Sequence, residues 1–138
     1  MSVDHKTTTL PTEVKDIPGA AELHDWFGYW PTFHDAEIIS LHLNREGSSS
    51  LRVHTWETTK EVVEKGYYVL AKHVVVEIIL ETVSDLSLDD FSQQNVISGL
   101  NIEKRDSGFR LLLGACYGLA GRIEAERLSI RITPGQPV

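Results

Sequence analysis

The residues with the clearest chemical potential are His34, Asp35 and Glu37, in the stretch WPTFHDAEI at residues 30–38. Imidazole and carboxylate groups can carry protons in acid/base catalysis and can bind metal ions. In an extended segment, His34 would project away from Asp35 and Glu37, so only the two carboxylates would converge. We therefore favour a structural interpretation, in which Asp35 binds backbone amides of the Trp-Pro turn and Glu37 caps a strand. An acid/base enzyme that uses the three residues is the alternative.

The histidines on predicted strands suggest a second kind of chemistry, a zinc site. His42 and His54 are expected on the same outer face of a hairpin, and His73 on a later strand is a third candidate ligand. No HxH or HExxH spacing supports this site, and surface imidazoles are more often solvated than ligating. We expect no metal and no cofactor. The single cysteine, Cys116, lies in the apolar run RLLLGACYG and is expected to be a buried, unreactive thiol.

The segment WFGYWPTF, residues 26–33, holds five of the eleven aromatic residues. Such a cluster either closes one end of a hydrophobic core or anchors a partner. Trp26 and Phe33 fit the first role. Tyr29 and Trp30 are the better candidates for contact with a partner.

The elements that must position these residues follow from the hydrophobic periodicity. In IPGAAELHDWFG, Leu23, Trp26 and Phe27 have helical spacing, and Gly28 stands where a left-handed C-cap belongs. From Glu37 onward the apolar residues alternate, which is typical of strands with one buried face. We expect strands at residues 37–44, 51–57, 68–83, 95–104, 109–118 and 122–133. The fold class is therefore α+β: a mainly antiparallel β-sheet of about six strands, curled or sandwich-like, with a short N-terminal helix.

Three details of these strands are specific expectations. Ile39, Leu41 and Leu43 form the inward set of the first strand. In the last strand, Ile123 and Ala125 have one parity and the later apolar residues have the other, which predicts a β-bulge near residues 126–127. In the long third strand, Val75 and Ile79 point outward among polar residues, which favours self-assembly slightly.

Composition and charge limit the class of protein. The chain of 138 residues fits a single domain, 1–138, with flexible ends at 1–16 and 134–138. Thirteen basic and twenty acidic residues give a net charge of -7, which discourages binding to nucleic acid or to an anionic membrane and favours a basic partner. The N-terminal residues lack the apolar region of a signal peptide, so we expect a cytoplasmic protein.

The string FGYWPTFHDAEIISLHL, followed by a hairpin and RVHTWE, resembles the N-terminal half of bacterial proteins grouped as immunity protein 50. The resemblance covers mainly residues 20–57, and the later strands fit the same layout more loosely. It implies a protein that protects a cell from a polymorphic toxin by binding that toxin. It carries over no catalytic residue.

The function expected from the sequence is therefore non-enzymatic binding of a basic protein toxin, with electrostatic steering of the encounter. A small-molecule-binding or self-assembling module, present as a homo-oligomer, is the alternative beside the enzyme. The expected contact residues are Tyr29, Trp30, Asp35, Glu37, Glu77 and Glu81.

Overall fold

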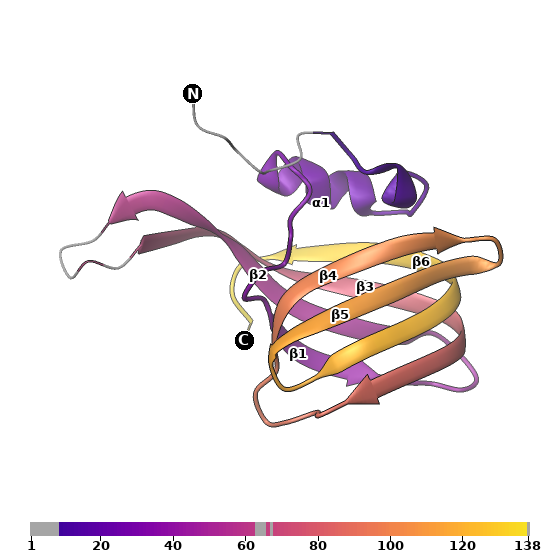
Figure 1. Cartoon of the computed structure of the whole chain (residues 1–138). Coiled ribbons are helices and arrows are strands. Elements are labelled where there is room, and N and C mark those ends of the chain that lie inside the picture. The colour runs from indigo at the N-terminus through magenta and orange to yellow at the C-terminus, as the bar shows by residue number, and fades with distance from the viewer. Residues whose placement is uncertain (1–8, 63–65, 67, 138) are drawn as a thin grey trace.

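The computed structural model describes residues 9–62, 66 and 68–137 (Figure 1). Within this part of the chain, two short helices precede six strands. The elements are η1 (Thr12–Val14), α1 (Ala20–Phe27), β1 (Glu37–His42), β2 (Ser49–Val62), β3 (Tyr68–Asp89), β4 (Val96–Arg105), β5 (Gly108–Tyr117) and β6 (Ala120–Pro134). The predicted α+β class, with a mainly antiparallel sheet and a short N-terminal helix, is confirmed. Of the ends predicted to be flexible, residues 1–8 and 138 lie outside the described residues.

The sheet curls until it closes. The strand order is β1-β2-β3-β6-β5-β4, all neighbours are antiparallel, and β4 returns to β1 to complete a barrel. This last seam is short: the only register pair it contains within the described residues is Glu37 with Val96. Backbone hydrogen bonds extend the seam, because Ile38 N–H donates to Asn95 O at 2.8 Å and Ile97 N–H donates to Ala36 O at 2.9 Å.

Alternating apolar side chains fill the barrel. On β2, Leu51 and Val53 are buried, and on β3 the buried series includes Val76 and Ile78, so the period of two places one face of each strand inside. Val14, Leu23 and Phe27 of the N-terminal helices join the same core. Figure 1 shows α1 lying across the outside of the strands, above β6 and β4 in that view. No helix in the described residues is long and apolar enough to cross a membrane.

The N-terminal segment is fixed to the barrel where the backbones approach most closely. Ile130 N–H of β6 donates a 2.7 Å hydrogen bond to Pro18 O. The next residue, Gly19, has φ 91°, and a Cβ atom there would lie 1.7 Å from Ile130 O. Only glycine fits this contact. At the other end of α1, Gly28 has φ 82° and its N–H donates to His24 O, which confirms the predicted left-handed cap.

The inward set predicted for the first strand is wrong in part. Ile38 is the buried residue of β1, Ile39 and Leu41 are half-buried, and Leu43 is 47% exposed beyond the end of the strand. The reason is a register irregularity: Ile38 pairs with Val53, whereas Ser40 pairs with the adjacent Arg52. One extra residue in β1 shifts which side chains face the core.

The change of parity predicted in the last strand is present, because Ala125 and Leu128 are both buried. The irregularity in pairing lies on the neighbouring strand instead, between Val83 and Asp85 of β3. The nearby Thr82 has φ 57°, a backbone conformation that residues other than glycine seldom adopt. The change of parity in β6 therefore lies close to one extra residue in β3.

The β2–β3 hairpin is longer than the barrel that contains it. Register pairs join β1 to β2 only as far as His54, and register pairs join β6 to β3 only from Val74 onward. Beyond these residues the two strands pair with each other, as Thr58 does with Leu70. Figure 1 shows this part projecting from the barrel as a two-stranded arm. One edge of the arm, at residues 55–58, therefore has no strand beside it among the described residues.

Candidate partner-binding site

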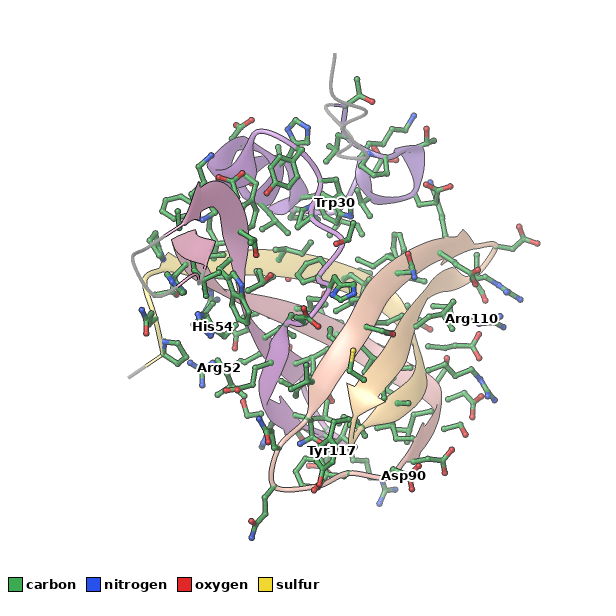
Figure 2. The ribbon with its side chains drawn as sticks, turned by 60° about the vertical axis from the view of Figure 1, so that its left-hand side comes forward. Trp30, Arg52, His54, Asp90, Arg110 and Tyr117 are labelled. Atoms are coloured by element: carbon green, nitrogen blue, oxygen red, sulfur yellow. The ribbon has the colours of Figure 1, made fainter. Side chains whose placement is uncertain are left out.

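A cleft of about 280 Å³ lies between the loop that leads into β1 and the arm of β2. Residues 29–35 form one side, and residues 55–58 form the other. We call this the aromatic cleft, because Tyr29, Trp30 and Trp56 are among its lining residues. Figure 2 labels Trp30 on the loop below α1, and His54 on the adjacent strand β2.

The loop side of the cleft has a fixed backbone. Phe33 has φ 62° and Asp35 has φ 65°, so the chain turns sharply twice before β1 begins. Phe33 is buried in the core, and Ala36 N–H donates to Phe33 O at 3.0 Å. Asp35 N–H donates to Ile97 O of β4 at 2.9 Å. The core and the barrel seam together hold this loop in place.

Because of these turns, the premise of an extended segment is wrong. His34 and Asp35 are adjacent in space, with Nδ1 of His34 3.1 Å from Oδ1 of Asp35. The two side chains are 66% and 61% exposed, respectively. The pair resembles part of an acid/base site, but it is open to solvent.

The structural role predicted for Asp35 is not the one observed, whereas Glu37 is the first residue of β1. Within the described residues, the Asp35 carboxylate contacts His34 and lies 3.9 Å from Sγ of Cys116, with no bond to amides of the Trp-Pro turn. Cys116 is exposed, so the expectation of a buried thiol is wrong. The reason is that β6 pairs with β5 only from Phe109 to Leu113, which leaves the end of β5 uncovered on that side.

The arm side of the cleft contributes an acid that is held in place. Glu57 is 19% exposed, and its Oε1 accepts a 3.0 Å hydrogen bond from the Tyr29 hydroxyl. Its Oε2 lies 3.9 Å from Nζ of Lys72, and that ammonium also donates to Phe27 O at the end of α1. These contacts connect the helix, the loop and the arm around one carboxylate.

Next to the cleft, three aromatic rings pack together on the outer face of β2 and β3. His54 Nε2 lies 3.0 Å from His73 Nδ1, and the two rings are stacked with centroids 5.2 Å apart. The Trp56 ring lies 4.9 Å from that of His54 and 6.1 Å from that of His73. Burial lowers the pKa of His54, the neighbouring His73 lowers it further, and Glu37 partly opposes both effects.

The zinc hypothesis predicted that His42 would join this group, and the register places it elsewhere. His42 pairs with Ser50, whereas His54 pairs with Glu37 at the opposite end of the β1–β2 ladder. Only His54 and His73 of the three meet. In the described part of the chain, no group of three or more histidine, cysteine, aspartate or glutamate side chains could hold a metal ion.

The six expected contact residues do not form one patch. Tyr29, Trp30 and Asp35 line the aromatic cleft, and Glu37 lies beside it as the register partner of His54. The other two are on β3 and form ion pairs with arginines of β6. These pairs are Glu77 with Arg131 at 3.4 Å and Glu81 with Arg127 at 3.2 Å.

Glu81 and Arg127 line a different and larger cleft, of about 700 Å³. This second cleft is formed mainly by the β1–β2 loop, residues 43–49, and by residues 81–86 of β3. Residue 49 begins β2, whereas residues 55–58 of the same strand line the aromatic cleft. The larger cleft therefore lies at the start of β2, and the aromatic cleft lies at its middle.

Two residues of the aromatic cleft, Trp56 and Glu57, are absent from the predicted contacts. Their position depends on the arm, because β2 continues to Val62 whereas the predicted strand ended at residue 57. The sequence signal that bears on them is the alternation of His54 with Trp56, which places both rings on one face.

The family model described as Immunity protein 50 matches residues 19–134. The matched region includes α1, all six strands of the described barrel and both sides of the aromatic cleft. Searches of curated proteins and of solved structures gave no match.

Proposed function

Because the chain belongs to the immunity protein 50 family, we propose that it neutralises a cognate toxin by binding directly to it, without catalysing a reaction. The observation that carries this proposal is the match to the family over residues 19–134, which takes in the whole described barrel. The proposed place of action is the cytoplasm, where an internal toxin would otherwise act.

The aromatic cleft supports a binding role. Interfaces obtain most of their energy from a few aromatic and arginine anchors in well-packed positions, surrounded by polar groups. Tyr29 and Trp30 are half-buried against the core and border a concave surface, so their contact surfaces are already ordered. A partner that covers them loses little conformational entropy from this side of the interface.

Charge favours a basic toxin. The chain has a net charge of -7, which accelerates the encounter with a positively charged partner. Asp35 and Glu37, at the cleft and beside it, are proposed as direct contacts. Glu77 and Glu81 are proposed as weaker ones, because each already forms an ion pair with an arginine of β6.

Of the alternatives, self-assembly loses part of the feature that favoured it, which was the outward position of Val75 and Ile79; Ile79 is half-buried. Val75 on the outer face of β3 is only 5% exposed, so the described residues of one chain already cover it. The enzyme alternative has one supporting contact, between His34 and Asp35, but that pair is open to water. Binding without catalysis is therefore the proposal that we develop.

The experiment is co-expression with the toxin encoded beside this gene. We expect growth to be restored, and the purified proteins to form a stable complex in isothermal titration calorimetry with 1:1 stoichiometry. The matched control is a toxin from an unrelated system expressed at the same level. Restoration of growth without any complex, or a complex that leaves the toxin active, would contradict the proposal.

A further inference from the structure

The lining of the aromatic cleft indicates which chemical group enters it. We propose that the cleft receives the side chain of an arginine from a loop of the partner protein. This inference rests on the proposed function and specifies its contact chemistry: the guanidinium lies against the aromatic lining of the cleft and pairs with the carboxylate of Asp35. Glu57, already held by Tyr29 and Lys72, adds negative charge on the arm side.

Size is the first reason. The cleft has a volume of about 280 Å³, whereas pockets that enclose a small-molecule ligand are typically about 300–1,000 Å³. The cleft is therefore at the small end of that range, where a single long side chain fits. The uncovered edge of β2 at residues 55–58 also leaves room for the loop that carries this side chain.

Charge is the second reason. Among the described residues that line the cleft, two are carboxylates and none is lysine or arginine. Behind the lining, Lys72 contacts Glu57 at 3.9 Å while its ammonium donates to Phe27 O. Asp35 is the more exposed of the two acids. Among its described contacts, the one group that could carry a positive charge is the imidazole of His34. The cleft therefore attracts a cation.

The aromatic walls select between the two basic side chains. A guanidinium is planar, more weakly hydrated than an ammonium, and able to stack on an aromatic ring while it donates to a carboxylate. The ammonium of lysine is compact and strongly hydrated, so it gains less from flat walls. Arginine combines both properties that the lining offers.

The cleft is formed before any partner arrives. The Tyr29 hydroxyl bonds to Glu57 at 3.0 Å across the cleft, and Asp35 N–H is bonded to Ile97 O. The Trp56 ring is packed against His54 and His73. Binding an arginine therefore requires little rearrangement, which favours affinity.

The test uses small probes, so it does not depend on the toxin. The ¹⁵N-labelled protein is titrated at millimolar concentration with N-acetyl-arginine-N-methylamide, and the indole N–H signals are followed by NMR. The control probe is the citrulline analogue, which has nearly the same shape without the charge. We expect the arginine probe to shift the signals of Trp30 and Trp56. Trp26, whose indole donates to Lys72 O at 2.9 Å outside the cleft, serves as the internal reference.

Variants locate the contact. Asp35→Asn is expected to weaken binding of the arginine probe about tenfold, the size typical of losing one charge-assisted hydrogen bond. Asp106→Asn, in the β4–β5 turn, removes the same charge at an exposed site away from the cleft and is expected to change nothing. Circular dichroism of both variants shows whether each is folded. If Asp35→Asn does not fold, Trp30→Leu replaces it in the same titration.

A third probe, the corresponding lysine analogue, is titrated in the same way. Three results would overturn the inference: the citrulline probe shifts the indole signals as much as the arginine probe, the lysine probe binds more tightly than the arginine probe, or the arginine probe shifts neither Trp30 nor Trp56. Failure of the proposed function is a separate outcome. If the arginine probe binds in the cleft but no toxin is neutralised, the function fails and the cleft chemistry stands. If the toxin binds Asp35→Asn and Trp30→Leu as tightly as the natural protein, the function stands and the cleft is not the contact.

Discussion

The imidazoles of His54 and His73 are in direct contact, with Nε2 of the first 3.0 Å from Nδ1 of the second. A hydrogen bond between two imidazoles requires a lone pair on one of them, so at least one ring is neutral in this arrangement. The pair lies beside Trp56, which lines the aromatic cleft. Protonation of both histidines would therefore place two like charges next to the proposed contact surface.

This pair makes stability depend on pH. The pKa of His54 is lowered from 6.5 by burial and by His73, so below pH 6.5 the unfolded chain binds a proton that the folded chain resists. Stability is therefore lost as the pH falls through 6.5 and regained as it rises. Urea denaturation at pH 7.5 and pH 5.5 measures the effect. His54→Gln is expected to reduce the pH dependence, and His42→Gln, at an exposed position, is the control. If the free energy of unfolding depends on pH equally in the two variants, His54 is not the cause of the pH dependence.

The contact between Gly19 and β6 predicts a large effect of one methyl group. Gly28→Ala is expected to destabilise the fold only through the left-handed conformation, by about 1–2 kcal/mol, because nothing lies within 4 Å of the added Cβ. Gly19→Ala has a similar conformational cost, and its Cβ also overlaps Ile130 O, which adds about 1–3 kcal/mol. Thermal or urea unfolding of the two variants gives the difference. Equal losses would mean that the N-terminal segment moves away from β6 without penalty.

Asn95 links two turns at one end of the barrel. Its Oδ1 accepts hydrogen bonds from Leu119 N–H at 2.9 Å and from Ser92 N–H at 3.0 Å, and its side chain is buried. Asn95→Ala leaves two amides without this partner, at about 1–3 kcal/mol for each one that water cannot reach. Asn101→Ala, at an exposed position of β4, is the matched control. A free energy of unfolding that is the same for both would show that water replaces the amide.

For toxin binding, Trp30 is the most informative position. Trp30→Ala is expected to weaken the complex by about 2 kcal/mol or more, roughly thirtyfold in Kd, because buried aromatic anchors dominate interface energies. Phe91→Ala removes another aromatic side chain, 70% exposed in the β3–β4 connection, and is expected to leave Kd unchanged. Calorimetric titration with the cognate toxin compares the two. A larger loss for Phe91→Ala would move the interface to that end of the barrel.

The strands could be predicted from the sequence, because the alternation of apolar and polar side chains depends only on neighbouring residues. Residues such as Leu51 and Val53 follow the period of two wherever the backbone is regular. Closure of the barrel was not readable, since it depends on β4 meeting β1 from far along the chain. The extra residue in β1 and the left-handed turns at Phe33 and Asp35 also escape a periodic pattern, because tertiary contacts impose them.

For the site, the residues that are close in sequence could be predicted, and those that the fold brings together could not. Tyr29, Trp30 and Asp35 are close together in sequence, and the structure places all three at one cleft. Glu57 reaches that cleft only because β2 extends past the end of β1 as an arm. Glu77 and Glu81 have the outward orientation expected of them, but the register of β3 with β6 gives each an arginine neighbour that alternation alone does not reveal.

The short seam between β1 and β4 has a consequence for the complex. Asp35 lines the aromatic cleft, and its N–H donates to Ile97 O as part of the seam. A partner that fixes the loop is therefore also expected to stabilise the seam between β1 and β4. We expect amide hydrogen exchange at Ile38 and Ile97 to slow when toxin binds, while exchange at Val76, inside the long β2–β3–β6 ladders, changes little. Uniform protection across all strands would instead mean that the toxin stabilises the whole barrel rather than the seam between β1 and β4.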